Sequence, residues 1–126
     1  MATILSVIDT AYRATLEEQD DTSLWFTHAC KNSGADVHIL LTGNAVNYAV
    51  KTQNPKPLHL GTSSVSSPNK FHEDLESFTK TGSKVFFIKE DLIERGIGTD
   101  SLIGIEGIKR SNLASFIDDY DHIWHW

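Results

Sequence analysis

Short apolar segments alternate with amphipathic segments along most of the chain. Residues 3–8, 37–41 and 84–88 are rich in aliphatic and β-branched side chains and carry few polar positions. Such near-continuous apolar runs are typical of strands that are buried on both faces of a sheet. We expect further strands at 104–109 and 122–126.

The segments between these runs predict helices. Asp20, Asp21 or Thr22 offers an N-cap for a helix that ends near Ser33, before Gly34. Phe71, Leu75 and Phe78 form one apolar stripe on a helix over 69–80, and shorter helices are expected over 45–51, 90–95 and 111–119, the last capped by Ser111. The buried face of the first helix is predicted to hold Leu24, Trp25 and Ala29, and Cys30 is expected to pack there as a small hydrophobe.

Strands that alternate with helices predict βαβ units. We therefore expect an α/β fold with three α/β/α layers and a mainly parallel sheet of about five strands. Residues 1–126 show no internal repeat and no boundary, so they are expected to form a single domain. Residues 53–68 hold all three prolines and predict a long loop.

Composition narrows the classes of function. The net charge is −6 and the basic residues are scattered, which argues against a nucleic-acid partner. The longest apolar run, 85–88, is too short to cross a membrane. The N-terminal MATILSVID has no signal-peptide features, so a cytoplasmic location is expected. A single cysteine excludes an intrachain disulfide, and the six histidines lack metal-ligand spacing, so neither a metal site nor a cofactor is predicted.

Polar residues follow three of the expected strands. Asp9 ends the first strand, Thr42, Gly43 and Asn44 follow the second, and Lys89 and Glu90 follow the third. In open α/β sheets ligands bind beyond the carboxyl ends of the strands, so these six residues are the candidate pocket. The alternative is structural, because a strand-to-helix turn also needs Gly and Asn, and acids favour a helix start.

Two tryptophans near the C-terminus form a second candidate site. Trp124 and Trp126 share one face of the closing strand, with His125 on the other. Exposed at a sheet edge they suit a protein interface, where tryptophan is enriched, and buried they are core. The sequence leaves both interpretations open.

Two segments carry a family resemblance. KVFFIKEDLIERGI (84–97) resembles the DsrH/TusB branch of the DsrE/DsrF/DsrH sulfur-relay family, and the closing SNLASFIDDYDHIWHW is similar to that branch's C-terminus. The first half, with VHILLTGNAVNYAV, is similar to DsrE-like proteins in general. Together the resemblance covers most of the chain except 53–67.

The resemblance implies an oligomeric α/β protein connected with sulfur relay or sulfur oxidation. In the carrier branch a cysteine at the end of the third strand takes up sulfane sulfur, and that pattern falls at about Ile88 here. An aliphatic side chain cannot replace a thiolate nucleophile. The leading hypothesis is therefore a non-carrier accessory member without catalytic residues, acting as a homo-oligomer or as a partner of sulfur-handling proteins. The alternatives are a small-molecule or anion-binding protein that uses the strand-end pocket, and a persulfide carrier that works through Cys30.

Overall fold

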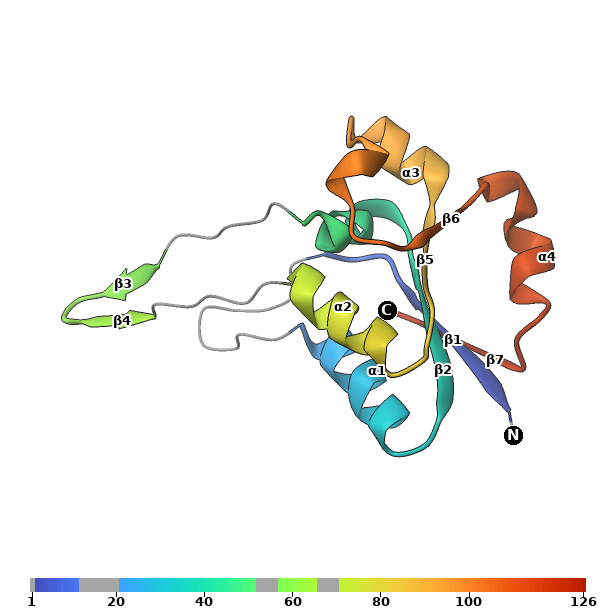
Figure 1. The fold of residues 1–126 in the computed structure, drawn as a ribbon, viewed down its shortest axis with the longest axis horizontal. Helices are drawn as coiled ribbons and strands as arrows, with labels where there is room; N and C mark the ends of the chain where they lie inside the picture. The colour runs from blue at the N-terminus through green and yellow to red at the C-terminus, as the bar shows by residue number, and fades with distance from the viewer. Residues whose placement is uncertain (1, 12–20, 52–56, 66–70) are drawn as a thin grey trace.

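Five parallel strands form the central sheet of the computed structural model, which describes residues 2–11, 21–51, 57–65 and 71–126. Their order across the sheet is β6-β5-β2-β1-β7, so β6 and β7 are the two edges (Figure 1). The strands are β1 (Thr3–Ile8), β2 (Asp36–Leu41), β5 (Val85–Ile88), β6 (Glu106–Ile108) and β7 (His122–His125). Every pairing is parallel, as the alternating pattern predicts.

Helices cover both faces of the sheet. They are α1 (Thr22–Asn32), α2 (Phe71–Lys80), α3 (Lys89–Glu94) and α4 (Leu113–Ile117), with 3-10 turns η1 (Gly43–Ala49), η2 (Thr99–Ser101) and η3 (Arg110–Asn112). α1 and α2 lie on one side of the sheet and α4 lies alone on the other (Figure 1). The expected three-layer α/β/α fold is thus confirmed. Within the described residues, none of these helices has the length and apolar character needed to span a bilayer.

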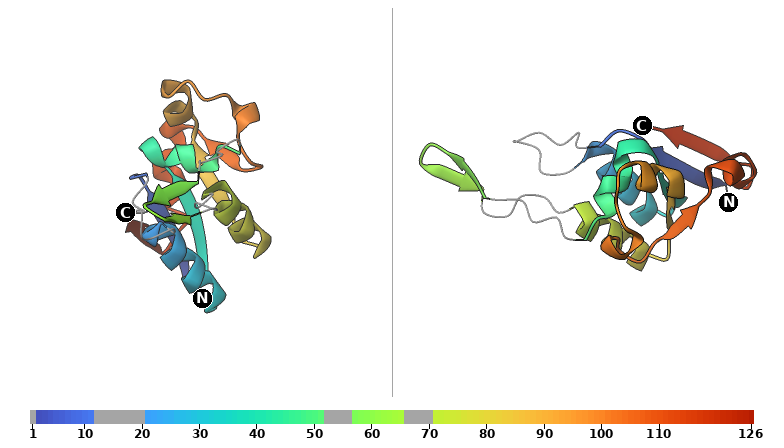
Figure 2. Two further views of the ribbon diagram at one scale, coloured as in Figure 1. Left: turned by 90° about the vertical axis from the view of Figure 1, so that its left-hand side faces the viewer. Right: turned by 90° about the horizontal axis from the view of Figure 1, so that it is seen from above.

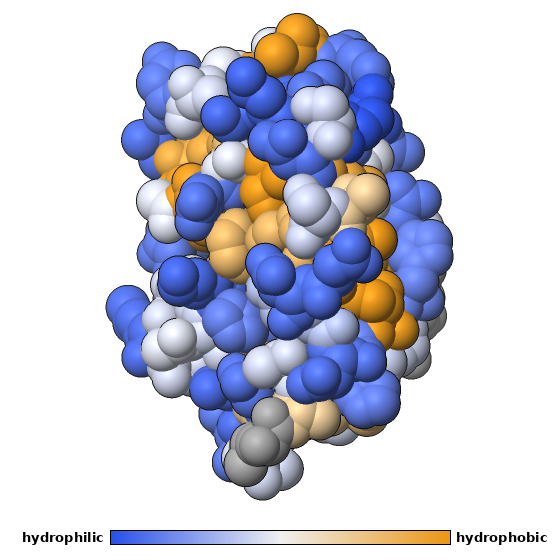
Figure 3. All heavy atoms as spheres, turned by 90° about the vertical axis from the view of Figure 1, so that its right-hand side faces the viewer, coloured by the Kyte–Doolittle hydropathy of each residue, from blue (hydrophilic) through white to orange (hydrophobic). Residues whose placement is uncertain are grey.

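The two faces of the sheet bury unequal cores. The larger core joins Ile39 and Leu41 of β2 to Leu75 and Phe78 of α2, and all four are buried. The smaller core lies under α4, where the ring of Phe116 meets Phe86 edge-on at a centroid distance of 4.9 Å. Polar side chains cover most of the α4 side, and apolar groups appear only between them (Figure 3).

A chain of buried hydroxyl groups joins α1 to the sheet. Thr27 Oγ1 donates to the Ser23 carbonyl at 2.8 Å, and Ser6 Oγ lies 2.9 Å from Thr27 Oγ1. Ser23 and Thr27 therefore face inward beside Leu24, while Trp25 is 60% exposed. The expectation that Trp25 is buried is wrong, because hydrogen bonds satisfy the inward polar groups and leave the indole on the outer side of the helix.

Asp21 fixes the start of α1. Its Oδ1 accepts the backbone N–H groups of Ser23 at 2.9 Å and Leu24 at 3.2 Å, and its Oδ2 accepts the Tyr48 hydroxyl. Burial by itself would raise the pKa of Asp21, but these hydrogen bonds outweigh it and hold the pKa below its ordinary value. The carboxylate is therefore an ionised N-cap that also ties α1 to η1.

The structure differs from the expected elements in three places. The predicted loop 53–68 contains a hairpin of β3 (Leu58–Leu60) and β4 (Ser63–Val65), and residues 52–56 and 66–70 lie outside the described residues. Gly61 supplies the positive φ of 62° at its turn. The helix expected over 45–51 is a 3-10 turn, and α4 begins after Asn112 rather than with a Ser111 cap.

Candidate functional site

The carboxyl ends of the parallel strands bring Asp9 next to Thr42. The Thr42 hydroxyl donates to Asp9 Oδ1 at 3.0 Å. Gly43 follows with a φ of +52°, and a Cβ there would lie 2.5 Å from the same Asp9 oxygen. Only glycine fits this turn without moving Asp9.

The backbone amide of Gly43 faces a carboxylate of the chain itself. It donates to Asp91 Oδ2 at 2.8 Å, and the other oxygen of Asp91 pairs with the Arg110 guanidinium. The Asp91 side chain is largely buried. Asp91 therefore occupies the place that an external anion would take at this amide.

Arg95, the C-cap residue of α3, contacts the same region. Its Nε and Nη2 donate to Asn44 Oδ1 at 3.0 and 2.9 Å, and its Nη1 donates to the Asp91 carbonyl at 3.0 Å. The side-chain oxygen of Asn44 thus accepts two hydrogen bonds from the Arg95 guanidinium. The Glu-Asp-Leu…Arg-Gly segment that carries the family resemblance acts here as a scaffold between α3 and η1.

Glu90 and Lys89, the last two predicted pocket residues, lie in different places. Glu90 Oε2 accepts the Arg110 backbone N–H at 2.8 Å, and this hydrogen bond lowers the pKa of Glu90. Lys89 lies instead at the β6 edge, where its Cγ and Cε approach within 2.9 Å of a Cβ built on Gly107. Five of the six predicted residues therefore lie in the strand-end network, and Lys89 does not.

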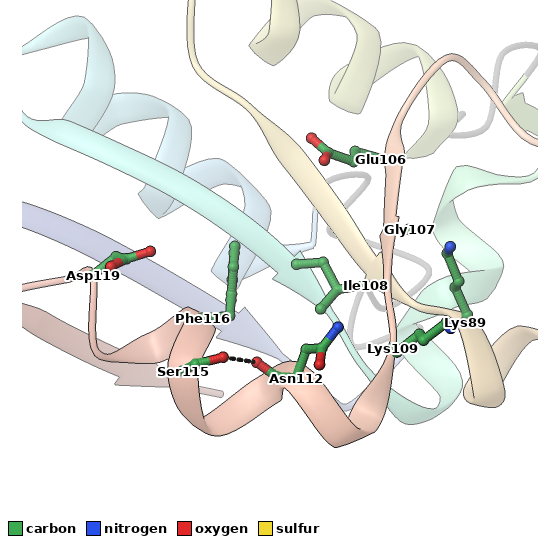
Figure 4. Close-up of a pocket in the computed structure, with 9 residues that line it drawn as sticks. All are labelled: Lys89, Glu106, Gly107, Ile108, Lys109, Asn112, Ser115, Phe116 and Asp119. Atoms are coloured by element: carbon green, nitrogen blue, oxygen red, sulfur yellow. Dashed lines mark hydrogen bonds between the residues drawn. The ribbon is translucent and has the colours of Figure 1, made fainter.

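Lys89 lines a hollow of about 590 Å³ beside β6 and α4 (Figure 4). Its lining consists of two lysines, two acids, and small, amide and apolar groups: Lys89, Glu106, Gly107, Ile108, Lys109, Asn112, Ser115, Phe116 and Asp119. Lys89 and Lys109 lie at one end, and Glu106 and Asp119 lie away from them (Figure 4). The other lining residues all lie within 106–119, and the sequence carries no signal that brings Lys89 to this segment.

The closing tryptophans meet α1 at the other edge of the sheet. The ring of Phe26 lies 5.7 Å from those of both Trp124 and Trp126. The Trp126 indole donates to Ser6 Oγ at 2.9 Å, which leaves Trp126 half-buried, like Trp124. Phe26, Trp124 and Trp126 therefore form an aromatic surface, and Trp25 is exposed at the neighbouring position of α1. Sequence reasoning found Trp124 in β7 and Trp126 directly after it, and placed Trp25 wrongly.

The two candidate positions for a sulfur carrier differ in burial. Ile88 is 1% exposed and belongs to the core beneath α4. Cys30 is free and half-buried in the last third of α1. Among the described residues, no group of three His, Cys, Asp or Glu side chains is arranged to hold a metal ion.

Two solved structures share this arrangement over nearly their whole length. The chain aligns with YchN from E. coli at a TM-score of 0.77 and 24% identity, covering 100% of both chains. It aligns with MTH1491, a protein of unknown function from Methanobacterium thermoautotrophicum, at a TM-score of 0.63 and 14% identity, covering 98% of this chain and 99% of the other. The chain has the DsrE-like fold of these proteins. No protein-family model matches the sequence, and no curated protein is significantly similar to it.

Proposed function

We propose that this chain is a non-carrier accessory member of the DsrE-like group. It acts by binding: it forms a homo-oligomer in the cytoplasm and serves as a partner of sulfur-handling proteins. The observation that supports the binding role is the aromatic surface, in which Phe26 is 39% exposed and its ring packs against Trp124 of the edge strand β7. Tryptophan and phenylalanine are enriched at protein interfaces.

The chemistry of the strand ends supports a non-carrier role. The position that aligns with the carrier cysteine holds Ile88, whose side chain is buried and has no nucleophilic atom. The polar groups around it are bound to one another through Asp91, Arg95 and Arg110. This network supports structure at the position where a carrier would need an accessible thiolate.

The aromatic surface is tested by the oligomeric state. Sedimentation equilibrium at micromolar concentration is expected to give at least a dimer of the 14.1 kDa chain. Phe26→Ala should weaken association about tenfold, or roughly 1.4 kcal/mol, because an aromatic side chain that packs against Trp124 at the proposed interface is lost. Ile93→Ala is the matched control, since Ile93 is also exposed but lies on α3. A monomer at micromolar concentration contradicts the proposed homo-oligomer.

The carrier alternative is tested at Cys30. Intact-mass spectrometry after treatment with a sulfane-sulfur donor should show no adduct of about 32 Da, because the half-buried Cys30 side chain is expected to pack as a small hydrophobe. Cys30→Ala supplies the background for nonspecific sulfur. A stoichiometric adduct on Cys30 would make the chain a carrier.

A second candidate function rests on the hollow beside β6. Its volume of about 590 Å³ is that of a ligand site, and Lys89 and Lys109 place two ammonium groups at one end. An anionic small molecule would bind there, not at the Gly43 amide. Thiosulfate and inorganic phosphate are suitable probes, since a ligand that binds only the folded state raises the thermal midpoint. Lys109→Gln should abolish any such rise.

A further inference from the structure

Among the residues that the structure describes, no strand pairs with the outer side of β7, and its backbone groups follow a defined pattern. β7 pairs with β1 on one side and ends the sheet on the other (Figure 2). The backbone N–H of Trp126 donates to the Val7 carbonyl at 2.9 Å, and the backbone carbonyl of Trp126 accepts the Asp9 N–H at 3.2 Å. Successive residues of a strand direct these groups to alternate sides. Trp124 therefore also faces β1, and the N–H and C=O groups of Ile123 and His125 point outward.

The side chains of β7 suit a self-complementary pairing. The strand holds no Asp, Glu, Lys or Arg, so two copies bring no like formal charges together. Trp124 is half-buried on the α1 face, and Ile123 is 44% exposed on the α4 face. Both are apolar side chains that a second strand would cover.

We propose that β7 pairs antiparallel with β7 of a second copy across a two-fold axis, with Trp124 opposite the partner's Trp124. This inference rests on the proposed homo-oligomer and specifies how it assembles. The two five-stranded sheets then join edge to edge, and the aromatic surfaces of both copies become continuous on one face.

The outward groups select this register. With Trp124 opposite Trp124, Ile123 lies opposite the partner's His125, and such a pair exchanges both of its N–H···O bonds. The two-fold axis repeats the pair, so two pairs with two bonds each give four hydrogen bonds. Centring the axis on Ile123 places His125 opposite the partner's Asp121, whose N–H already donates to the Thr3 carbonyl. Centring it on His125 leaves Ile123 opposite no residue of β7.

The same register arranges the side chains. In the pair that is not hydrogen-bonded, opposite Cα atoms lie about 4.5 Å apart and the side chains are closest. Trp124 occupies that position and meets its own copy, next to the ring of Phe26, which lies 5.7 Å from it. On the α4 face, the partner's His125 covers Ile123. The exposed apolar groups of β7 are thereby covered on both faces.

Disulfide trapping tests the register. Trp124→Cys in a Cys30→Ala background places two cysteines directly opposite, where Cβ atoms are about 4.5–5.5 Å apart and small shifts reach disulfide geometry. Mild oxidation with oxidised glutathione is expected to give a covalent dimer in most of the protein on a non-reducing gel. His122→Cys is the matched control: it lies on the same face and strand, but opposite the partner's Trp126, so it should give at least tenfold less dimer.

A second pair of variants keeps Trp124 in place, in case its removal weakens the dimer. Ile123→Cys and His125→Cys, each in the Cys30→Ala background, should cross-link when mixed and give little dimer separately. A dimer by sedimentation without these cross-links, or with equal cross-linking at His122→Cys, overturns the register and leaves the proposed oligomer standing. A monomer by sedimentation overturns both.

Discussion

The two edges of the sheet differ in length and chemistry. β6 has three residues, with Gly107 at its centre, Glu106 beside it, and the stems of Lys89 and Lys109 close to the strand. β7 has four residues, no formally charged side chain and two half-buried tryptophan rings at or beside it. Short strands and lysines are common ways in which proteins protect an edge from pairing. β6 has this protection and β7 does not, so the comparison favours β7 over β6 for the association that we propose.

Among the variants that test this comparison, deletion of His125 and Trp126 should have the largest effect on stability. The deletion removes the Trp126 backbone bonds to Val7 and Asp9 and the indole bond to Ser6. We expect a loss of about 3–5 kcal/mol in the free energy of unfolding, as for other losses of a large aromatic side chain. Urea denaturation at a fixed protomer concentration measures it.

The same deletion separates the two interpretations of the tryptophans. If the rings serve the interface, the deleted chain should also sediment as a monomer under conditions in which it is folded. A folded, still oligomeric deletion variant would show that Trp126 serves only the core, and would move the interface away from β7.

A charged side chain on β7, like the lysines close to β6, should have a smaller effect that is selective for association. Ile123→Lys adds a charge on the exposed α4 face of the edge strand and should weaken association at least tenfold, or about 1.4 kcal/mol. Its effect on unfolding should stay within about 0.5 kcal/mol, because the site is on the surface. Glu106→Lys makes the matched change at β6. Equal weakening by both variants would remove the distinction between the edges.

Asp21→Asn should have the smallest effect on the edges and a distinct pH dependence. At pH 7 it should destabilise the fold by about 1–2 kcal/mol, because an ionised N-cap accepts several hydrogen bonds more strongly than an amide does. The pKa of Asp21 is lowered by folding, so this stabilisation is complete above the unfolded value near 3.8 and is lost as pH falls through the folded value.

Urea denaturation from pH 7 to pH 2.5 should therefore show wild type and Asp21→Asn converging in the acid range. Association at pH 7 should be unchanged, because Asp21 is buried away from the open edge of β7. A constant difference between the two proteins at all pH values would mean that the carboxylate titrates normally in the fold.

Much of the fold follows from the apolar pattern. β1, β2 and β5 are continuous apolar runs, so their position and their parallel pairing were predictable. The hairpin β3–β4 was missed because its strands have three residues each and lie among prolines and serines. Trp25 was misplaced because helical periodicity does not reveal that Ser23 and Thr27 are satisfied by hydrogen bonds in the interior.

The candidate pocket was predictable in position but not in its contacts. Parallel strands necessarily bring Asp9, Thr42 and Glu90 to one edge of the sheet. Asp91 and Arg110 are 19 residues apart and meet only because β6 pairs with β5 and returns the chain to α3. The acids at the start of α3 fit a favourable dipole interaction equally well, so the sequence carries no signal for the ion pair.

The pairing of β1 with β7 has a consequence for folding kinetics. Thr3 and Asp121 are hydrogen-bonded across 118 positions of the chain. Closing a loop of that length costs about 4 kcal/mol of chain entropy, which local helix formation does not have to overcome. Contacts of such high sequence separation slow folding, so we expect β7 to dock after the helices have formed. The edge at which we propose assembly is then the last to form, so a chain would pair through this strand only after its own sheet is complete.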